Sequence, residues 1–199
     1  MKPMRAPQVW LLSLLGLMAS VPAHAQAYCA LRDPVAAISE MLPEADAHRA
    51  HVRTVRKEHQ ARLRELLDFT IMNGELGQHT LYVVSNDDAV IGYVHTRTEK
   101  GRFGLNEFIW ALDEELNVLS FKHQRCRDPA RFRVDQAALF ELVEGRSASD
   151  LADMLDEEGQ LRPEVMAFEG EDERRYASSL VRSGVKTILI SRLVWTELF

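Results

Sequence analysis

The fold of this chain is decided by residues 80–95, which read TLYVVSNDDAVIGYVH. Two runs rich in β-branched and aromatic residues, Thr80–Val84 and Val90–His95, flank the turn residues Asn86-Asp87-Asp88. Extended runs separated by such turn residues are typical of a β-hairpin. We therefore expect two antiparallel strands here.

Two more strand patterns follow the hairpin. A polar loop is expected at Thr98–Gly101, and strands are expected over Asn106–Leu112 and Asn117–His123. Four consecutive strands joined by short turns predict an antiparallel meander.

Helical patterns lie on both sides of these strands. The predicted fold class is therefore α+β, with an antiparallel β-meander of about four or more strands packed against N-terminal and C-terminal helices. On the N-terminal side, a short helix is expected from Pro34 to Pro43, and the strongly basic segment His48–Glu65 ends in a helical pattern. On the C-terminal side, helices are expected over Ala137–Val143, after a capping box at Ser147–Asp150, and from Tyr176 to Trp195.

Composition excludes several classes of protein. The chain has 199 residues, of which 46% are hydrophobic and 27% charged, so extensive disorder and a multi-span membrane protein are excluded. A formal charge of −6 argues against a nucleic-acid partner. The charge is uneven, because residues 144–173 hold 11 acidic side chains and only two basic ones.

The first 27 residues have the pattern of a secretory signal peptide. Lys2 and Arg5 precede an apolar run over residues 9–19, and a small-x-small cleavage site ends at Ala27. Cleavage predicts a periplasmic or secreted chain of residues 28–199 that forms a single α+β domain and has no transmembrane segment. An uncleaved membrane anchor is the alternative.

Secretion also affects the interpretation of the two cysteines, Cys29 and Cys126. An even number of cysteines in an oxidising compartment predicts a disulfide between them. A redox-active or metal-binding pair is the alternative, although the sequence lacks a Cys-x-x-Cys motif.

The order of these elements resembles a known family. A helix ending in Met41-Leu42-Pro43, a hairpin, the loop Gly101-Arg102-Phe103-Gly104 and two more strands are similar to the periplasmic FMN-binding domain of Rnf-type and sodium-pumping electron-transfer complexes. The resemblance covers roughly residues 35–125. It implies FMN as cofactor and, as partner, a membrane electron-transfer complex or another periplasmic protein. The family attaches FMN to the Thr of a Ser-Gly-Ala-Thr motif, and the nearest match here is Ser183-Gly184-Val185-Lys186-Thr187, with one extra residue before Thr187.

Candidate FMN-binding residues follow from the resemblance and from the needs of a flavin. An aromatic face for the isoalloxazine and donors for the phosphate are required. Alternatively, the aromatic residues form the core, and the arginines pair with residues 144–173 or face solvent. A related possibility is that the arginines hold an anionic lipid or a quinone-associated partner at a membrane surface. The candidates are Phe103, Gly104 and Trp110, with Tyr93, for the ring; Arg125 and Arg127, with Arg131 and Arg133, for the phosphate; and Thr187 for attachment.

No catalytic residue or metal site can be named from the sequence. His48 and His51 have helical spacing but lack a third ligand, and whether the strand histidines His79, His95 and His123 converge is open. Two hypotheses remain: a flavin-binding domain of an electron-transfer system, and a non-catalytic accessory or binding protein that keeps the fold without flavin.

Overall fold

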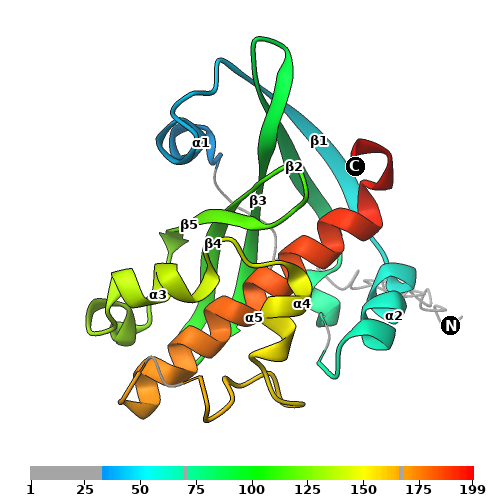
Figure 1. Ribbon diagram of the computed structural model, residues 1–199. Coiled ribbons are helices and arrows are strands. Elements are labelled where there is room, and N and C mark those ends of the chain that lie inside the picture. Colours follow the sequence, from blue (N-terminus) through cyan, green and yellow to red (C-terminus); the bar gives the residue numbers. More distant parts are fainter. Residues whose placement is uncertain (1–32, 70, 166–167) are drawn as a thin grey trace, which may run out of the picture.

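A computed structural model describes residues 33–69, 71–165 and 168–199. Its centre is a five-stranded antiparallel sheet whose strands lie in sequence order (Figure 1). The predicted α+β meander is confirmed. The strands are β1 (Ala47–Val55), β2 (Gly77–Asn86), β3 (Ala89–Gly101), β4 (Gly104–Leu112) and β5 (Val118–Arg125).

Helices cover the two faces of this sheet (Figure 1). On one face, Ile38 and Leu42 of the α1 region form an apolar cluster with Val94 and Ile109 of the sheet. On the other face α5 packs across β3 and β4, with α2, α3 and α4 beside it. The helices are α1 (Val35–Met41), α2 (Lys57–Leu66), α3 (Gln136–Val143), α4 (Ala148–Asp153) and α5 (Glu171–Val194), and short 3₁₀ helices span η1 (Asn73–Glu75), η2 (Pro129–Phe132) and η3 (Thr196–Leu198).

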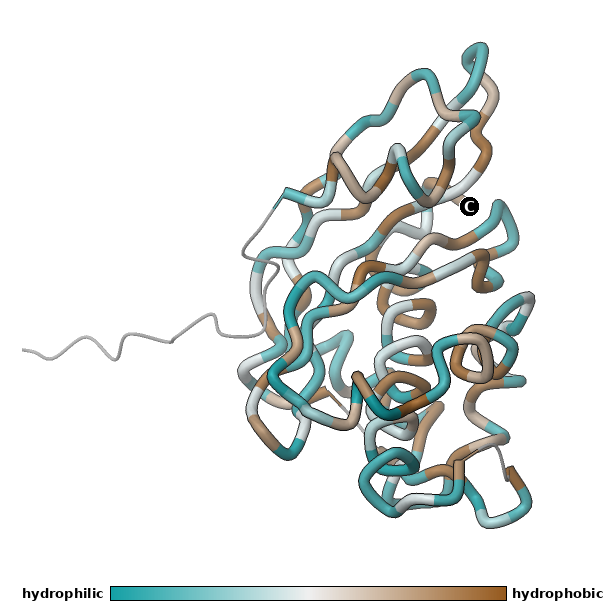
Figure 2. The backbone as a smooth tube through the Cα atoms, turned by 90° about the vertical axis from the view of Figure 1, so that its left-hand side faces the viewer, coloured by the Kyte–Doolittle hydropathy of each residue, from teal (hydrophilic) through white to brown (hydrophobic). Residues whose placement is uncertain are grey.

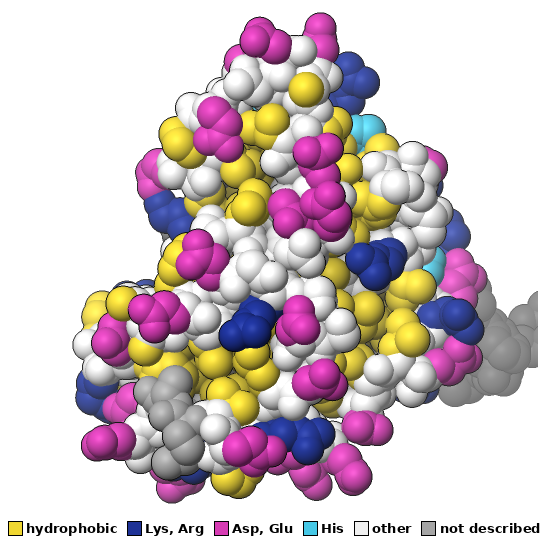
Figure 3. Space-filling view, viewed as in Figure 1, with side chains coloured by type: hydrophobic (Ala, Val, Ile, Leu, Met, Phe, Trp, Pro, Cys, Tyr) yellow, Lys and Arg dark blue, Asp and Glu magenta, His cyan; other side chains and the backbone are white. Residues whose placement is uncertain are grey.

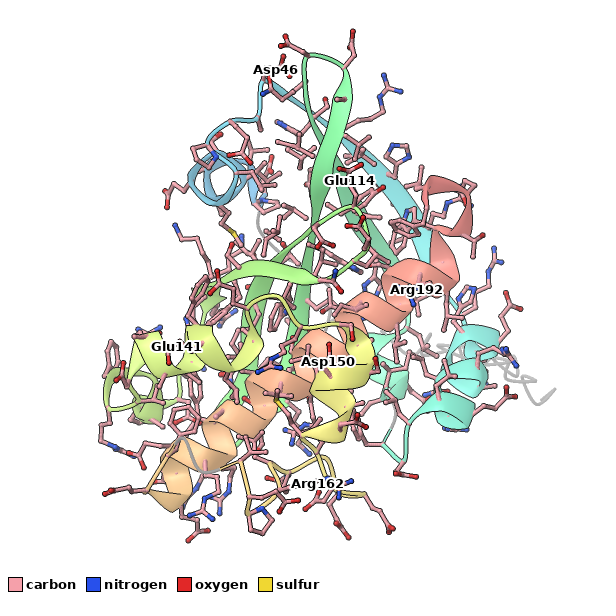
Figure 4. All side chains as sticks on the ribbon, viewed as in Figure 1. Asp46, Glu114, Glu141, Asp150, Arg162 and Arg192 are labelled. Atoms are coloured by element: carbon pink, nitrogen blue, oxygen red, sulfur yellow. The ribbon has the colours of Figure 1, made fainter. Side chains whose placement is uncertain are left out.

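The β2–β3 hairpin forms as its turn residues predict. Asp87 and Asp88 both have positive φ, 48° and 65°, as a type I′ turn requires. The Asp87 N–H donates to Asp46 Oδ2 at 3.0 Å, and Asp46 lies beside this turn (Figure 4). The turn is the hydrophilic tip at the top of Figure 2.

Two expectations about local structure are wrong. The helix expected at the end of the basic segment His48–Glu65 is confirmed as α2, but His48 and His51, whose spacing suggested a shared helix face, lie on opposite faces of strand β1. Eight of the nine β1 residues are exposed or half-buried, so this edge strand lacks the apolar alternation that marks a strand in sequence. The polar loop expected at Thr98–Gly101 is instead the end of β3.

Helix α5 extends the predicted C-terminal helix by one turn and lies very close to the sheet. A Cβ atom at Gly184 would stand 3.0 Å from Trp110 and 3.1 Å from Leu151, so glycine allows this approach. Glycine inside a helix costs about 1 kcal/mol relative to alanine, and here close packing offsets that loss. Among the described helices, α5 included, none is both long and apolar enough to cross a bilayer.

Candidate functional site

The interface between α5 and the sheet contains a buried ionic network. Arg97 Nη2 lies 2.8 Å from Glu75 Oε1, and Lys186 Nζ lies 3.6 Å from Glu75 Oε2. The same Nζ lies 2.9 Å from Glu99 Oε2, and Arg182 Nε lies 3.2 Å from Glu99 Oε1. The network therefore joins η1, β3 and α5.

The charges of this network do not cancel. Three cations face two carboxylates, which leaves one surplus positive charge. Arg182 has a side chain that is 14% exposed, whereas those of the other four members are 1% to 3% exposed. Unbalanced charge away from water is unfavourable, so an anion next to Arg182 would stabilise the whole network.

Arg182 lines a cleft of about 570 Å³ beside the N-terminal half of α5. We call it the α5 cleft. Its volume is in the range of small-molecule sites. Five cationic residues line it, Lys100, Arg102, Arg174, Arg175 and Arg182, against two acidic ones, Asp128 and Glu171. The surface around α5 in Figure 3 carries many acidic side chains, so the basic lining is a local feature.

Two of these cations are available to a ligand. Arg102 donates to Asp172 at 2.6 Å, and Arg175 pairs with Glu171. Lys100 and Arg174, in contrast, form no ion pair with any described residue, and the buried Nε of Arg174 has no hydrogen-bond partner there. Free guanidinium and ammonium donors are the groups that bind phosphate and carboxylate.

The β3–β4 turn that carries Arg102 and Phe103 depends on its glycines. Gly104 has a φ of 116°, which side-chain-bearing residues rarely adopt. A Cβ at Gly101 would lie 2.6 Å from Asn106 Nδ2. The geometry of the turn therefore explains the two glycines of the Gly-x-aromatic-Gly motif, and a bound ligand is not needed to explain them.

A second polar cluster links two of the strand histidines to α5. Because the Glu75 carbonyl only accepts, His79 donates to it through Nε2 at 2.9 Å. His79 Nδ1 then accepts from His95 Nε2 at 3.4 Å, and His95 Nδ1 accepts from the Ser191 hydroxyl at 2.9 Å. We call this the histidine chain.

Burial keeps both histidines neutral. Desolvation, reinforced by Arg97, lowers the pKa of His79 to about 3. Desolvation also lowers the pKa of His95 well below its usual value, with His79 and Arg97 adding to the effect. The chain holds β2, β3 and α5 together, and none of its side chains lines the α5 cleft.

His123 belongs to a separate cluster with Tyr176 and Cys126. Its ring stacks on Tyr176 and forms a hydrogen bond with that hydroxyl, and burial lowers its pKa to about 4. Burial raises the pKa values of the Tyr176 hydroxyl and the Cys126 thiol. The Cys126 thiol donates to Asn106 Oδ1 at 3.1 Å. A raised pKa makes it a poor nucleophile. The partner predicted for its disulfide, Cys29, lies outside the described residues, so that bridge stays a prediction.

The structure separates the candidate FMN residues into two groups. Trp110 and Thr187 are fully buried between β4 and α5. The Trp110 Nε1–H donates to Ser183 Oγ at 3.0 Å, and the Thr187 hydroxyl donates to the Ser183 carbonyl at 2.6 Å. Both polar groups are therefore engaged within the core.

The other candidates lie at one end of the sheet, except Tyr93, which pairs with Leu112 at the far end of β4 and whose hydroxyl donates to the Leu198 carbonyl at 2.9 Å. Phe103 lies in the β3–β4 turn with its side chain 47% exposed, and Gly104 is the first residue of β4. Arg125 and Arg127 are exposed where β5 ends, and Arg125 pairs in register with Glu107, three residues after Gly104. Arg133 binds Asp172 and Glu173, which confirms for that arginine the expected pairing with the acidic segment.

The sequence interpretation missed the cations that line the cleft. Lys100 lies near the end of β3, whereas Arg174 and Arg182 lie on α5, and only the fold brings the strand and the helix together. One signal was available: Arg97 and Glu99 continue the two-residue period of the core residue Tyr93, which places charged side chains on the buried face of β3.

No group of three or more His, Cys, Asp and Glu side chains within residues 33–69, 71–165 and 168–199 is arranged to hold a metal ion. A scan against protein-family models and searches of curated proteins and of solved structures found no match for this chain.

Proposed function

We propose that the protein is a secreted or periplasmic binding protein, without catalytic chemistry of its own, that takes a phosphate-bearing anion in the α5 cleft. The observation that carries the proposal is the surplus positive charge of the buried ionic network, which ends at Arg182 in the cleft. The free donors of Lys100 and Arg174 supply direct contacts to the ligand. A partly desolvated site strengthens such charge-assisted hydrogen bonds.

The residues do not fit covalent attachment of FMN at Thr187. The Thr187 hydroxyl is 0% exposed and bonded to its own helix, so a phosphoester there would require α5 to separate from the sheet. Trp110 is equally enclosed and cannot stack on a flavin without the same disruption.

Non-covalent FMN is a second candidate ligand, and the position of Phe103 favours it. The exposed ring of Phe103 follows Arg102, which lines the cleft, and could contact a flavin whose phosphate lies among the cleft cations. In that case the protein would serve a membrane electron-transfer complex or another periplasmic partner, as the resemblance implies.

Titration of FMN followed by its fluorescence, with riboflavin as the unphosphorylated comparison, tests both candidates. We expect inorganic phosphate to compete with FMN, and Lys100→Ala and Arg174→Ala each to weaken FMN binding about tenfold, the usual loss for one charge-assisted hydrogen bond. Arg192→Ala is the matched control, because Arg192 is an exposed arginine at the opposite end of α5 (Figure 4).

The outcomes separate the alternatives. If the protein binds phosphate but not FMN, the proposed anion site is supported and FMN is excluded as its ligand. Equal affinity for FMN and riboflavin, or no binding of either phosphate or FMN, would contradict the proposed role of the cleft.

A further inference from the structure

Two phenylalanines project from the end of the molecule at which α5 begins. Phe132, at the end of η2, is 77% exposed, and Phe103, in the β3–β4 turn, is 47% exposed. Each follows an arginine whose guanidinium lies over the ring: Arg131 at 4.2 Å from the Phe132 centroid and Arg102 at 5.4 Å from that of Phe103. Both exposed rings are therefore held beside a cation of their own loop, next to the acidic first turn of α5.

The two loops that carry these rings are tied to one carboxylate. Asp172 accepts from Arg102 at 2.6 Å through Oδ1 and from Arg133 at 3.2 Å through Oδ2. Arg133 directly follows Phe132 in the chain, so Asp172 holds both loops against the first turn of α5. The two rings therefore lie at the same end of the molecule.

Arginines that form no ion pair with a described residue lie at the same end of the sheet as the rings. Arg125 and Arg127 are exposed on the segment that leads from β5 to η2. Within the described part of the chain, neither they nor Arg131 forms an ion pair, whereas Arg102 and Arg133 share the carboxylates of α5. We call the two phenylalanines and these three unpaired arginines the aromatic–basic end.

We propose that the aromatic–basic end docks on the surface of an anionic lipid bilayer. The Phe103 and Phe132 rings would enter the interfacial layer, where aromatic side chains are favoured, and the unpaired arginines would contact lipid phosphates. This proposal uses the exposed loops and does not depend on a ligand in the α5 cleft.

The shape of this end favours a lipid surface over a protein partner. Its apolar part is two separate rings on loop tips, whereas a stable protein interface buries about 800 Å² on each side around a packed core. A few inserted side chains together with electrostatic attraction are sufficient for binding to a membrane surface.

Co-sedimentation with lipid vesicles tests the proposal. The processed chain, with its N-terminus established by mass spectrometry, is mixed with vesicles of equal parts phosphatidylglycerol and phosphatidylcholine, or of phosphatidylcholine alone. We expect binding to the anionic vesicles only, and weaker binding as salt rises.

Variants then separate the two contributions. Combined Phe103→Ser and Phe132→Ser should reduce partitioning at least about tenfold, because apolar area no longer leaves water. Arg125→Ala and Arg127→Ala should each reduce it roughly fivefold. Phe199→Ser is the matched control, since Phe199 is 44% exposed but lies at the C-terminus and packs on Tyr93 (Figure 1).

Three results would overturn the proposal: no binding to anionic vesicles, equal binding to neutral vesicles, or binding that survives the double phenylalanine substitution. Failure of the lipid-binding proposal can be distinguished from failure of the proposed anion binding in the α5 cleft. Arg174→Ala should leave vesicle binding unchanged, and Phe132→Ser should leave phosphate binding unchanged.

Discussion

Mild acid should destabilise this protein through three buried histidines. His79, His95 and His123 all have pKa values below the ordinary value of about 6.5, and burial is the main cause in each case. The unfolded chain therefore binds more protons than the folded chain once the pH falls below about 6.5. Their full contribution to stability is present above that pH and is lost progressively as the pH falls toward the folded-state values.

The size of the effect follows from linkage. At about pH 5.5, one unit below the unfolded pKa, each histidine lowers the free energy of unfolding by about 1 to 2 kcal/mol, and the three together by about 4 kcal/mol. Domains are usually stable by only about 5 to 15 kcal/mol. Acid of this strength should therefore remove a large part of the stability.

Urea unfolding at about pH 7.5 and about pH 5.5, at constant ionic strength, measures this loss. Trp110 and Trp195 are both fully buried, so their fluorescence reports unfolding. His79→Gln should reduce the number of protons taken up on unfolding by about one. A free energy of unfolding that stays constant or increases on acidification would refute the explanation.

Three further predictions concern packing, buried charge and the cysteines. Lys186→Met should lower the free energy of unfolding by about 1 to 3 kcal/mol, because Glu99 loses a buried charge-assisted hydrogen bond while each glutamate keeps one arginine, and chemical denaturation measures the loss. Gly184→Ala should raise helix propensity by about 1 kcal/mol yet destabilise the protein overall by about 1 kcal/mol or more, because its Cβ meets Trp110 at 3.0 Å; an increase in melting temperature would contradict this. Thiol titration of unfolded, unreduced protein should find no free thiol if Cys29 and Cys126 are bridged, and two reactive thiols would exclude the disulfide.

The sequence predicts the centre of the sheet well, because the relevant signals are local. Residues 80–95 contain most of β2, the first half of β3 and the aspartates that favour a type I′ turn, so the hairpin needs no knowledge of distant contacts. Strand β1 could not be found in this way. It is an edge strand with exposed faces, and it pairs with β2, from which it is separated in the sequence by helix α2.

The candidate site was much harder to predict. Arg125 and Arg127 are conspicuous in the sequence, but the cleft is lined instead by Lys100 of β3 and by Arg174 and Arg182 of α5, two elements that lie far apart in the chain. Charged residues are normally exposed, so composition gives no reason to expect the buried ionic network. Only the two-residue period of β3 indicates that some of its charges face the core.

The central claim is that the α5 cleft binds a phosphate-bearing anion, and calorimetric titration with inorganic phosphate tests it most directly. We predict saturable binding by the wild-type protein, a dissociation constant about tenfold higher for Arg174→Ala, and no change for Arg192→Ala. The absence of saturable binding, or an equal loss in both variants, would contradict the claim.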